Sequence, residues 1–583
     1  MKRLAITLLL IFIHSTSLAS QPQNKLHWAD WTDNLFTKAQ AENRYVILDL
    51  EAVWCHWCHM MDKNTYSDPA VQALLNKHYI NVRVDQDARP DLANRYRDYG
   101  WPATIIFAPD GTEIVKRAGY IAPENMTRLL QAVVDDPSPE KAAALNLPSS
   151  FARQGALSKE LIVQLQQNHS SAIDPIKGGL RTNHKYIDRD SLEYAIHLAS
   201  KGNQVQQKWA QKTLDQALKL FDPVWGGVYQ YSTQGDWDHQ HYEKIMLIQA
   251  SYLRLYALAW ATWKNPRYFK ATQQIINYLD RFLTSPESVF YTSQDADVIP
   301  GQHSDEFFKL NDQQRIVIGI PRIDKHIYAR ENGWMIEALA YLYEVSGNKA
   351  YLERAEKAAH WIIKHRSLKN GGYSHDEHDK AGPYLGDNLA MSRAFLQLYR
   401  AEGKRQWLDY AVTTTQYINQ HFQYEQGGFT PVVNRNQVIK PVPQIDENIS
   451  LVRFSNLLFH YTGDDAFKQM AEHGMRYLAT PEIAESRLTE AGILLANDEL
   501  KTDPMHITVI GGKDNAKANA LYHTAREVAQ LYKRIEWWDE REGKLPNPDV
   551  QYPSLGKTSA FVCNDGRCSL PLFSSKEILR MLN

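Results

Sequence analysis

Two cysteines, Cys55 and Cys58, are separated by two residues in the stretch VILDLEAVWCHWCHMMD, and a histidine follows each of them. Three chemistries use these residue types at this spacing: a dithiol redox pair, covalent haem attachment through Cys-x-x-Cys-His, and zinc coordination by thiolates and imidazoles. The flanking sequence has to decide between them.

The setting of the motif favours the redox pair. An apolar strand, VILDL, ends shortly before Cys55, and CHWCHMMDKNT begins a helix whose N–H groups and dipole would stabilise a thiolate. Pro102 stands before a second apolar strand in YGWPATIIF, and Asp49 lies inside the first strand. This combination resembles the thioredoxin superfamily, in which the proline is cis and faces the cysteines.

The two other chemistries lack part of what they need. Haem attachment normally opens a helical domain with a distant second ligand, whereas a buried type of strand precedes Cys55. Zinc needs four ligands, and no fourth is evident beside Cys55, Cys58 and one histidine. We therefore predict no metal and no cofactor.

The redox interpretation assigns roles within the motif. Cys55 is expected to be the exposed nucleophile and Cys58 the buried resolving thiol, with Asp49 able to take the proton of Cys58. An imidazolium beside the thiols would favour the thiolate, although ordinary first-turn and packing roles stay open for these side chains. The residues that could tune the thiols are Trp54, His56 and His59.

The first residues predict export. Lys2 and Arg3 precede an apolar run at residues 4–13, and small residues at 17–19 suit a signal peptidase. We expect a signal peptide at residues 1–19 and a secreted, periplasmic protein. Disulfides persist in that compartment.

The composition excludes some classes of partner. The chain has 65 basic and 67 acidic residues among 583, without a basic block that would neutralise a phosphate backbone, so nucleic acid is not an expected partner. No later apolar run is long enough for a membrane span. A chain of this length predicts two or three domains.

The distribution of strand and helix signals along the sequence predicts a multidomain protein with α/β and all-α parts. Residues 26–140 alternate strand and helix signals and predict the thioredoxin-like domain. Residues 155–495 have long helical stretches, punctuated by glycine pairs at 178–179, 226–227, 371–372 and 427–428. Residues 503–583 predict a small α/β region.

The glycine pairs suggest a repeat. The spacing between the second and third glycine pairs is about three times the other spacings. This predicts a repeat unit of roughly fifty residues in which two units have lost their glycine pair. About six such units fit a closed (α/α)6 toroid of helical hairpins, and an open helical solenoid is the alternative.

Longer motifs extend the resemblance over nearly the whole mature chain. They are WCHWCHMM, GGVYQYS with HQHYEKIMLIQA, FYTSQDADV, DKHIYARENGWMIEALA, YLGDNLAM and AFVCNDGRC. In this order they resemble the family of spermatogenesis-associated protein 20 and the bacterial YyaL-type proteins, which join a thioredoxin-like domain to an (α/α)6 toroid. Gln240 and Glu331 depart from the family pattern, which expects Pro and Trp there.

The toroid of this family is similar to six-hairpin glycosidases and sugar epimerases, whose funnel binds carbohydrate. Hydrolysis there needs two carboxyl groups at a set separation, and epimerisation needs an acid/base pair. The alternative is structural: aromatic core residues, and aspartates that cap helices. The candidate funnel residues are Trp237, His239, His241, Glu243, Asp295, Asp297, Asn332 and Asp387.

A second cysteine pair, Cys563 and Cys568, flanks the turn-forming residues 564–566. We expect a local structural disulfide, with a relay to Cys55 and Cys58 or free thiols as alternatives. For the whole chain we predict a thiol–disulfide oxidoreductase acting on exported dithiol or disulfide proteins. A carbohydrate-binding or carbohydrate-active protein and a non-catalytic interaction protein are the alternatives.

Overall fold

The computed structural model describes residues 26–141, 147–379, 381–433, 438–564 and 566–582. The signal peptide expected at residues 1–19 lies outside this part of the chain. Among the described helices, none is both long enough and apolar enough to pass through a bilayer.

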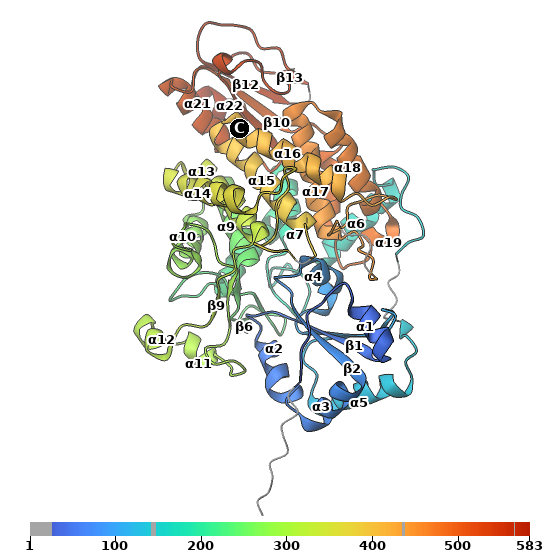
Figure 1. Cartoon of the computed structure of the whole chain (residues 1–583). Helices are drawn as coiled ribbons and strands as arrows, with labels where there is room; N and C mark the ends of the chain where they lie inside the picture. Colours follow the sequence, from blue (N-terminus) through green and yellow to red (C-terminus); the bar gives the residue numbers. More distant parts are fainter. Residues whose placement is uncertain (1–25, 142–146, 380, 434–437, 565, 583) are drawn as a thin grey trace, which may run out of the picture.

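The N-terminal part has the thioredoxin-like fold expected from the sequence (Figure 1). Its described strands form a sheet in the order β2-β1-β3-β4, in which β1 and β2 are parallel and the other neighbours are antiparallel. Because β1 carries apolar residues on both faces, it is buried inside the sheet. The elements are α1 (Leu35–Glu42), β1 (Tyr45–Glu51), α2 (His56–Met60) with a π-helical turn (Met61–Thr65), α3 (Pro69–His78), β2 (Tyr79–Asp85), α4 (Pro90–Tyr96), β3 (Ala103–Phe107), β4 (Glu113–Ala118) and α5 (Pro123–Asp135).

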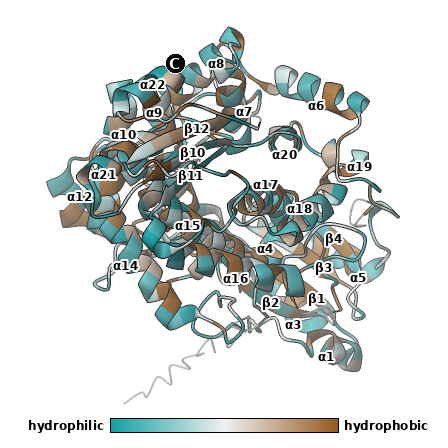
Figure 2. Ribbon diagram, turned by 90° about the horizontal axis from the view of Figure 1, so that it is seen from above, coloured by the Kyte–Doolittle hydropathy of each residue, from teal (hydrophilic) through white to brown (hydrophobic). Residues whose placement is uncertain are grey.

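The middle part is a closed helical toroid (Figure 2). In the described residues, six inner helices each pack on an outer helix, and the last inner helix also packs against the first, which closes the ring. The inner helices are α7 (Arg189–Ser200), α9 (Met246–Trp263), α13 (Ala329–Ser346), α15 (Leu385–Glu402), α17 (Ile445–Thr462) and α20 (Ala491–Glu499). Their outer partners are α8 (Gln204–Ala217), α10 (Pro266–Tyr278), α14 (Lys349–Arg366), α16 (Arg405–His421), α18 (Asp465–Leu478) and α6 (Lys159–Ala172).

In the repeat, a short turn connects the outer helix of one pair to the inner helix of the next pair. An isolated bridge closes five of these turns in the described residues, for example between Gln423 and Phe429, and the side chain of Asn448 then bonds both backbone groups of Phe429. Gly428 has φ +79°, a left-handed conformation that glycine adopts without strain. Corresponding bridges join Ile173 to Leu180, Phe221 to Val228, Thr284 to Phe290, and Ser367 to Tyr373.

One detail of the predicted repeat was wrong. The long interval between glycine pairs contains one further turn of the repeat, not the two that were predicted. This turn has Ser288 at φ +67° in place of a glycine. The remaining length is an excursion between this turn and α13 that contains β8, β9 and two short helices. The short elements of the toroid are β5 (Tyr231–Ser232), β6 (Gln240–His241), β7 (Lys244–Ile245), β8 (Ser293–Gln294), α11 (Asp305–Phe308), α12 (Asp312–Ile318), β9 (Ile323–Asp324) and α19 (Pro481–Ala484).

The C-terminal part is a small α/β unit with the strand order β11-β10-β12-β13. β10 is parallel to β11 and antiparallel to β12, and β12 is antiparallel to β13, so order and directions match those of the N-terminal sheet. Its elements are β10 (Met505–Ile510), α21 (Ala516–Arg526), β11 (Lys533–Trp538), β12 (Ser559–Asn564), β13 (Arg567–Cys568) and α22 (Ser575–Leu582).

The two α/β units lie at opposite ends of the toroid (Figure 1). The N-terminal domain covers the end where the inner helices begin: Asn94 donates to Glu447 at 3.0 Å, and Arg97 pairs with Asp446. At the other end, the hydroxyl of Tyr522 donates to the carbonyl oxygen of Arg400 at 2.8 Å. The toroid axis is therefore covered at both ends.

Candidate functional site

Strand β1 delivers Cys55 to the N-terminus of α2, where its sulfur accepts the backbone N–H of Cys58 at 3.1 Å. The two sulfurs are bonded, with the α-carbons 5.3 Å apart. The Trp101–Pro102 peptide bond is cis, as the thioredoxin resemblance implies. The strand, the cysteines and the proline thus occupy the positions that the sequence assigned to them.

The expected exposure of Cys55 was wrong. Cys55 is 4% exposed and Cys58 is 3% exposed. They form an apolar cluster with Ala52 and Trp54, and Ile245 of the toroid packs on it. The toroid therefore covers a site that sequence reasoning placed at the surface.

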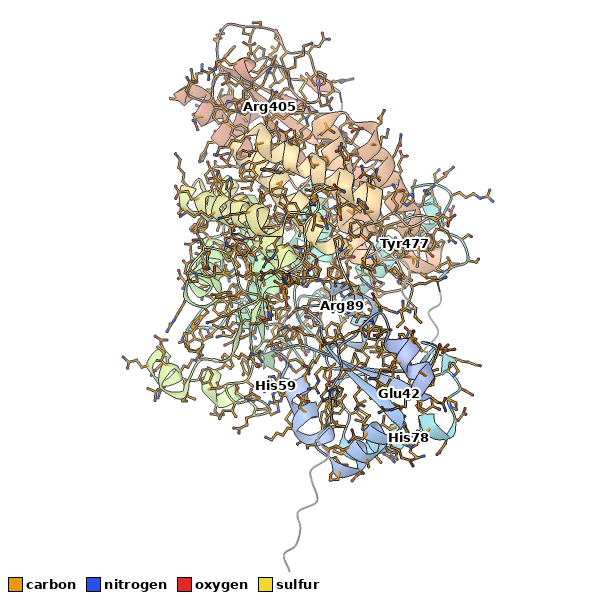
Figure 3. All side chains as sticks on the ribbon, in the orientation of Figure 1. Glu42, His59, His78, Arg89, Arg405 and Tyr477 are labelled. Carbon is orange, nitrogen blue, oxygen red and sulfur yellow. A yellow bond between two sulfur atoms is a disulfide. The ribbon has the colours of Figure 1, made fainter. Side chains whose placement is uncertain are left out.

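A backbone contact fixes this cover. The N–H of Ala296 lies 3.4 Å from the carbonyl oxygen of Trp54. The ammonium of Lys63 donates to the carbonyl oxygen of Gly301 at 3.2 Å. The segment 295–301 therefore lies along α2 and the turn that follows it, where Figure 3 marks His59.

Asp297 contacts both histidines of the motif. Its carboxylate lies 2.8 Å from Nδ1 of His56 and 3.1 Å from Nδ1 of His59. It also accepts the N–H of Gly301 at 2.8 Å. Although burial opposes ionisation, these hydrogen bonds outweigh it and lower the pKa of Asp297 to about 2. Asp297 is therefore a carboxylate at neutral pH.

Asp295 lies next to His59. Its carboxylate is 3.6 Å from Nε2 of His59 and accepts the N–H of Asp297 at 2.9 Å. Burial raises the pKa of Asp295 to about 6. For His59, burial opposes the charged form, but the hydrogen bond to Asp297 and the charge of Asp295 outweigh it and raise the pKa.

Two further titratable side chains lie nearby: His241 belongs to β6, and Glu243 directly precedes β7. Burial raises the pKa of Glu243 to about 7, and burial together with neighbouring imidazoles lowers that of His241 to about 4. His241 stacks on Tyr231 with ring centroids 4.4 Å apart. His303, which sequence reasoning missed, lies 4.1 Å from the ring of His56. Its position six residues after Asp297 was the available signal.

Asp49 is buried in β1 and lies 3.0 Å from Nη2 of Arg83. Burial raises its pKa to about 6 in spite of that guanidinium. The proton transfer from Cys58 that the sequence suggested for Asp49 stays a prediction. Trp54 donates its indole N–H to Asp87 at 2.7 Å, so it is a packed, hydrogen-bonded residue.

The predicted funnel residues do not form one site. His241, Glu243, Asp295 and Asp297 face the cysteine motif, as described above. Trp237 donates to the carbonyl oxygen of Lys177 and Asn332 bonds both backbone groups of Phe290, so both stabilise turns of the repeat. His239 is largely exposed and pairs with Asp236 at 2.9 Å.

Asp387 belongs to the contact between the N-terminal domain and the toroid. It lies 2.8 Å from Nδ1 of His375, whose Nε2 donates to the carbonyl oxygen of Asp87 at 2.7 Å. Burial opposes the charged imidazole, but Asp387 outweighs it and raises the pKa of His375 to about 9. Sequence reasoning missed His375, although it stands two residues after Tyr373, the bridged residue of a repeat turn.

Inside the toroid, a cavity of about 90 Å³ lies between the inner helices and the C-terminal unit. Pockets for small molecules usually have about 300 Å³ or more. Its charged walls are paired, since Arg453 bonds Glu499 at 2.8 Å and Arg393 bonds Glu337 at 2.8 Å. The charged residues that line this cavity are therefore largely paired with one another.

The second cysteine pair closes the β12–β13 hairpin. Cys563 and Cys568 are cross-strand partners, bonded through sulfur, with α-carbons 4.0 Å apart. This lies just below the usual span of about 4.4–6.8 Å. The hairpin belongs to the C-terminal unit, at the opposite end of the toroid from Cys55.

Comparison with known proteins gives the following. Residues 8–135 match the family model Thioredox_DsbH, described as a protein of unknown function, DUF255. Spermatogenesis-associated protein 20 of Mus musculus is 25% identical over 425 residues, which cover 66% of this chain and 50% of that protein. Thiol:disulfide interchange protein DsbD 2 of Pseudomonas aeruginosa is 34% identical over 84 residues, 14% of each chain. The structure of cellobiose 2-epimerase from Spirochaeta thermophila has a TM-score of 0.45 at 12% identity, covering 59% of this chain and 96% of that chain.

The N-terminal part is thus a thioredoxin-like DsbH/DUF255 domain, and the chain is homologous to spermatogenesis-associated protein 20. The chain spans about half the length of the curated relatives it matches, 50% for the mouse protein and 41% for the human one. The closed ring of the toroid is shown by the packing of its own helices.

Proposed function

We propose that the protein is a thiol–disulfide oxidoreductase that exchanges electrons between Cys55–Cys58 and cysteine pairs of exported proteins. The observation that carries the proposal is the disulfide at the N-terminus of α2, beside carboxylate-bound histidines. The similarity of this domain to part of a thiol:disulfide interchange protein supports it.

The exchange is a two-electron reaction in two steps. A client thiolate attacks one sulfur of the Cys55–Cys58 bond, which gives a mixed disulfide and a free thiolate on the other cysteine. The second client thiolate then attacks the mixed disulfide, so the client leaves oxidised and both cysteines are reduced. Run backwards, the same steps reduce a client disulfide. The direction depends on the partner's potential.

In this proposal, His56 exchanges protons with the thiols and Asp297 positions the imidazole. With its Nδ1–H donated to Asp297, His56 keeps the proton-accepting Nε2, which is buried and has no hydrogen-bond partner among the described residues. A carboxylate that fixes the tautomer of an imidazole next to a cysteine is an arrangement that activates thiols. Asp297 is thus a positioning residue, and Cys55 and Cys58 are the catalytic residues.

Access to the disulfide has to be opened. Both cysteines are buried under Ile245 and the segment 295–301, and a client sulfur needs a direct approach to the bond. We infer that this segment moves away when a client binds. The contacts of Asp297 with His56 and His59 hold it closed.

A carbohydrate function has less support in the described residues. The N-terminal domain covers the mouth of the toroid, and the predicted funnel residues are divided among four locations: the cysteine motif, the turns of the repeat, the exposed pair of His239 and the domain contact of Asp387. We also propose that the protein is exported. The support for export is the sequence of residues 1–19. Fractionation of cells that produce the full chain tests it: the mature protein is expected with the periplasmic marker.

The experiment that tests the proposed activity uses the mature full chain. Equilibration in glutathione buffers of increasing ratio should convert Cys55 and Cys58 together between disulfide and dithiol, and the protein should catalyse insulin disulfide reduction by dithiothreitol. Cys55→Ser should abolish this catalysis, and His239→Gln, which changes an exposed pair, should keep it. Equal rates for wild type and Cys55→Ser would contradict the proposal and favour a non-catalytic role.

A further inference from the structure

Three metal-ligand side chains from two domains meet beside the disulfide. His59 comes from α2, and Asp295 and Asp297 follow β8 of the toroid. One donor atom of each lies within 4.8 Å of the other two. One imidazole and two carboxylates are a donor set that first-row divalent metals bind.

Glu243 is a further buried carboxylate beside these three donors, outside the group that meets within 4.8 Å. β7 pairs with β8 so that Lys244 faces Gln294, which sets Glu243 across from Asp295. The backbone N–H of His56 favours the charged form of Glu243, so the carboxylate lies near the start of α2. Its Oε2 is buried and has no hydrogen bond in the described structure, with Nδ1 of His241 4.0 Å away. A buried carboxylate oxygen without a partner is costly unless a cation or a proton satisfies it.

The surroundings orient these carboxylates. Asp297 is held by the N–H of Gly301 and by His56, and Asp295 by the N–H of Asp297. The ion pairs of Asp295 and Asp297 in the described residues are with imidazoles only. Such outer contacts are what fixes ligands in metal sites.

We propose that His59, Asp295 and Asp297 bind one Zn²⁺ ion at the contact between the thioredoxin-like domain and the toroid, with Glu243 as the further carboxylate beside them. Zinc fits because these three residues offer one nitrogen and two oxygens, which leave one position of a tetrahedral site for Glu243 or water, whereas magnesium and calcium favour six or more oxygens. Bonds of about 2.1 Å place donor atoms about 3.4 Å apart. The donors of His59, Asp295 and Asp297 lie within 4.8 Å of one another, so small rotations of these three side chains bring them to that spacing. The site does not use the cysteines, whose sulfurs are bonded to each other.

The ion would act on access to the disulfide. It would link α2 to the segment that covers Cys55, so removing it would loosen that cover without changing the cysteines. This consequence rests on the proposed redox function, whereas the zinc site itself does not.

The test measures zinc in the oxidised mature chain, where the thiols cannot bind it. Isothermal titration with Zn²⁺ should give one site per chain, and Asp295→Asn and His59→Gln should each weaken it by roughly 100-fold or more, since loss of outer contacts alone costs 10–100-fold. Glu243→Gln should weaken it less. His239→Gln removes a histidine from an exposed His–Asp pair and should leave the affinity unchanged.

A second readout separates ligand loss from misfolding. Zinc should raise the melting temperature of wild type and of Cys55→Ser/Cys58→Ser, but not that of Asp295→Asn. If Asp295→Asn does not fold, His59→Gln and Glu243→Gln carry the comparison. The proposal is overturned if the oxidised wild type binds no zinc. It is also overturned if every ligand variant binds zinc as tightly as the wild type. Loss of binding in Cys55→Ser/Cys58→Ser also overturns it, because the cysteines would then be ligands.

Discussion

The two α/β units at the ends of the toroid share a sheet order and strand directions but not a chemistry. In the N-terminal unit, the central strand β1 leads into Cys55 and α2, and cis-Pro102 stands before β3. In the C-terminal unit, β10 leads into Gly511 ahead of α21, and Thr558 stands before β12. Strand topology alone therefore does not create a redox site.

The cysteines of the C-terminal unit stand elsewhere in the shared topology. Cys563 and Cys568 are cross-strand partners on the β12–β13 hairpin, which corresponds to the β3–β4 hairpin of the N-terminal unit. The comparison teaches that position in the sheet decides the role: a cysteine at a helix N-terminus can form a stabilised thiolate, and a hairpin pair stabilises a local loop.

The largest expected difference between the two cysteine pairs is in the catalysis of disulfide exchange. Cys55→Ser should reduce insulin reduction to the uncatalysed rate, because no nucleophile remains in the N-terminal unit. Cys563→Ser/Cys568→Ser should keep the wild-type rate. Loss of activity in the second variant would break the contrast and favour a relay between the two pairs.

The next effect concerns docking of the two units. The N-terminal unit docks through the charged pair His375–Asp387, whose imidazolium bonds Asp87, and the C-terminal unit through the hydroxyl of Tyr522. The folded pKa of His375, about 9, exceeds the unfolded value of 6.5. This stabilisation is complete below pH 6.5 and is lost as the pH rises through 9.

The loss is up to about 3 kcal/mol, at 1.36 kcal/mol for each unit of pKa difference. Denaturant unfolding of the wild type between pH 6 and 10 measures it. His375→Gln should remove this part of the pH dependence. An unchanged pH profile in that variant would show that the imidazolium does not stabilise the docking.

The hairpin disulfide should have a smaller effect on stability. Because the closed loop is short, Cys563→Ser/Cys568→Ser should lower the free energy of unfolding by about 2 kcal/mol. Thermal unfolding of the variant beside the oxidised wild type measures this. A variant as stable as the wild type would mean that the hairpin needs no clamp.

The smallest effect concerns the cover over the active pair. In reduced protein at neutral pH, Cys55 should react slowly with iodoacetamide, because the segment 295–301 shields it. Asp297→Ala removes the contacts with His56 and His59 and should speed alkylation of Cys55 by about tenfold, equivalent to about 1.4 kcal/mol of opening free energy. Fast labelling of Cys55 in wild type would contradict the buried site.

Local patterns predicted the N-terminal fold well. The strand before Cys55, the turn of helix after it and Pro102 are short-range signals, and their positions agree with the structure. The helical periodicity and glycine pairs likewise indicated the ring. The turn at Ser288 was missed because a serine there adopts the left-handed conformation that glycine marks elsewhere.

Contacts between domains could not be predicted from spacing. Asp297 lies 241 residues from His56 in the sequence, and nothing in the composition of either segment indicates that they meet. The burial of Cys55 follows from the same contact. The carboxylates were recognised as functional candidates, but the sequence assigned them to a carbohydrate funnel because it could not show which domain they face.

The central claim is that Cys55 and Cys58 exchange disulfides with client proteins. Cys58→Ser, produced with its export signal, leaves Cys55 without its resolving partner and should accumulate mixed disulfides visible on non-reducing gels. The account predicts adducts that disappear on reduction and in Cys55→Ser/Cys58→Ser. Absence of adducts in Cys58→Ser, or adducts attached through Cys563 or Cys568, would contradict it.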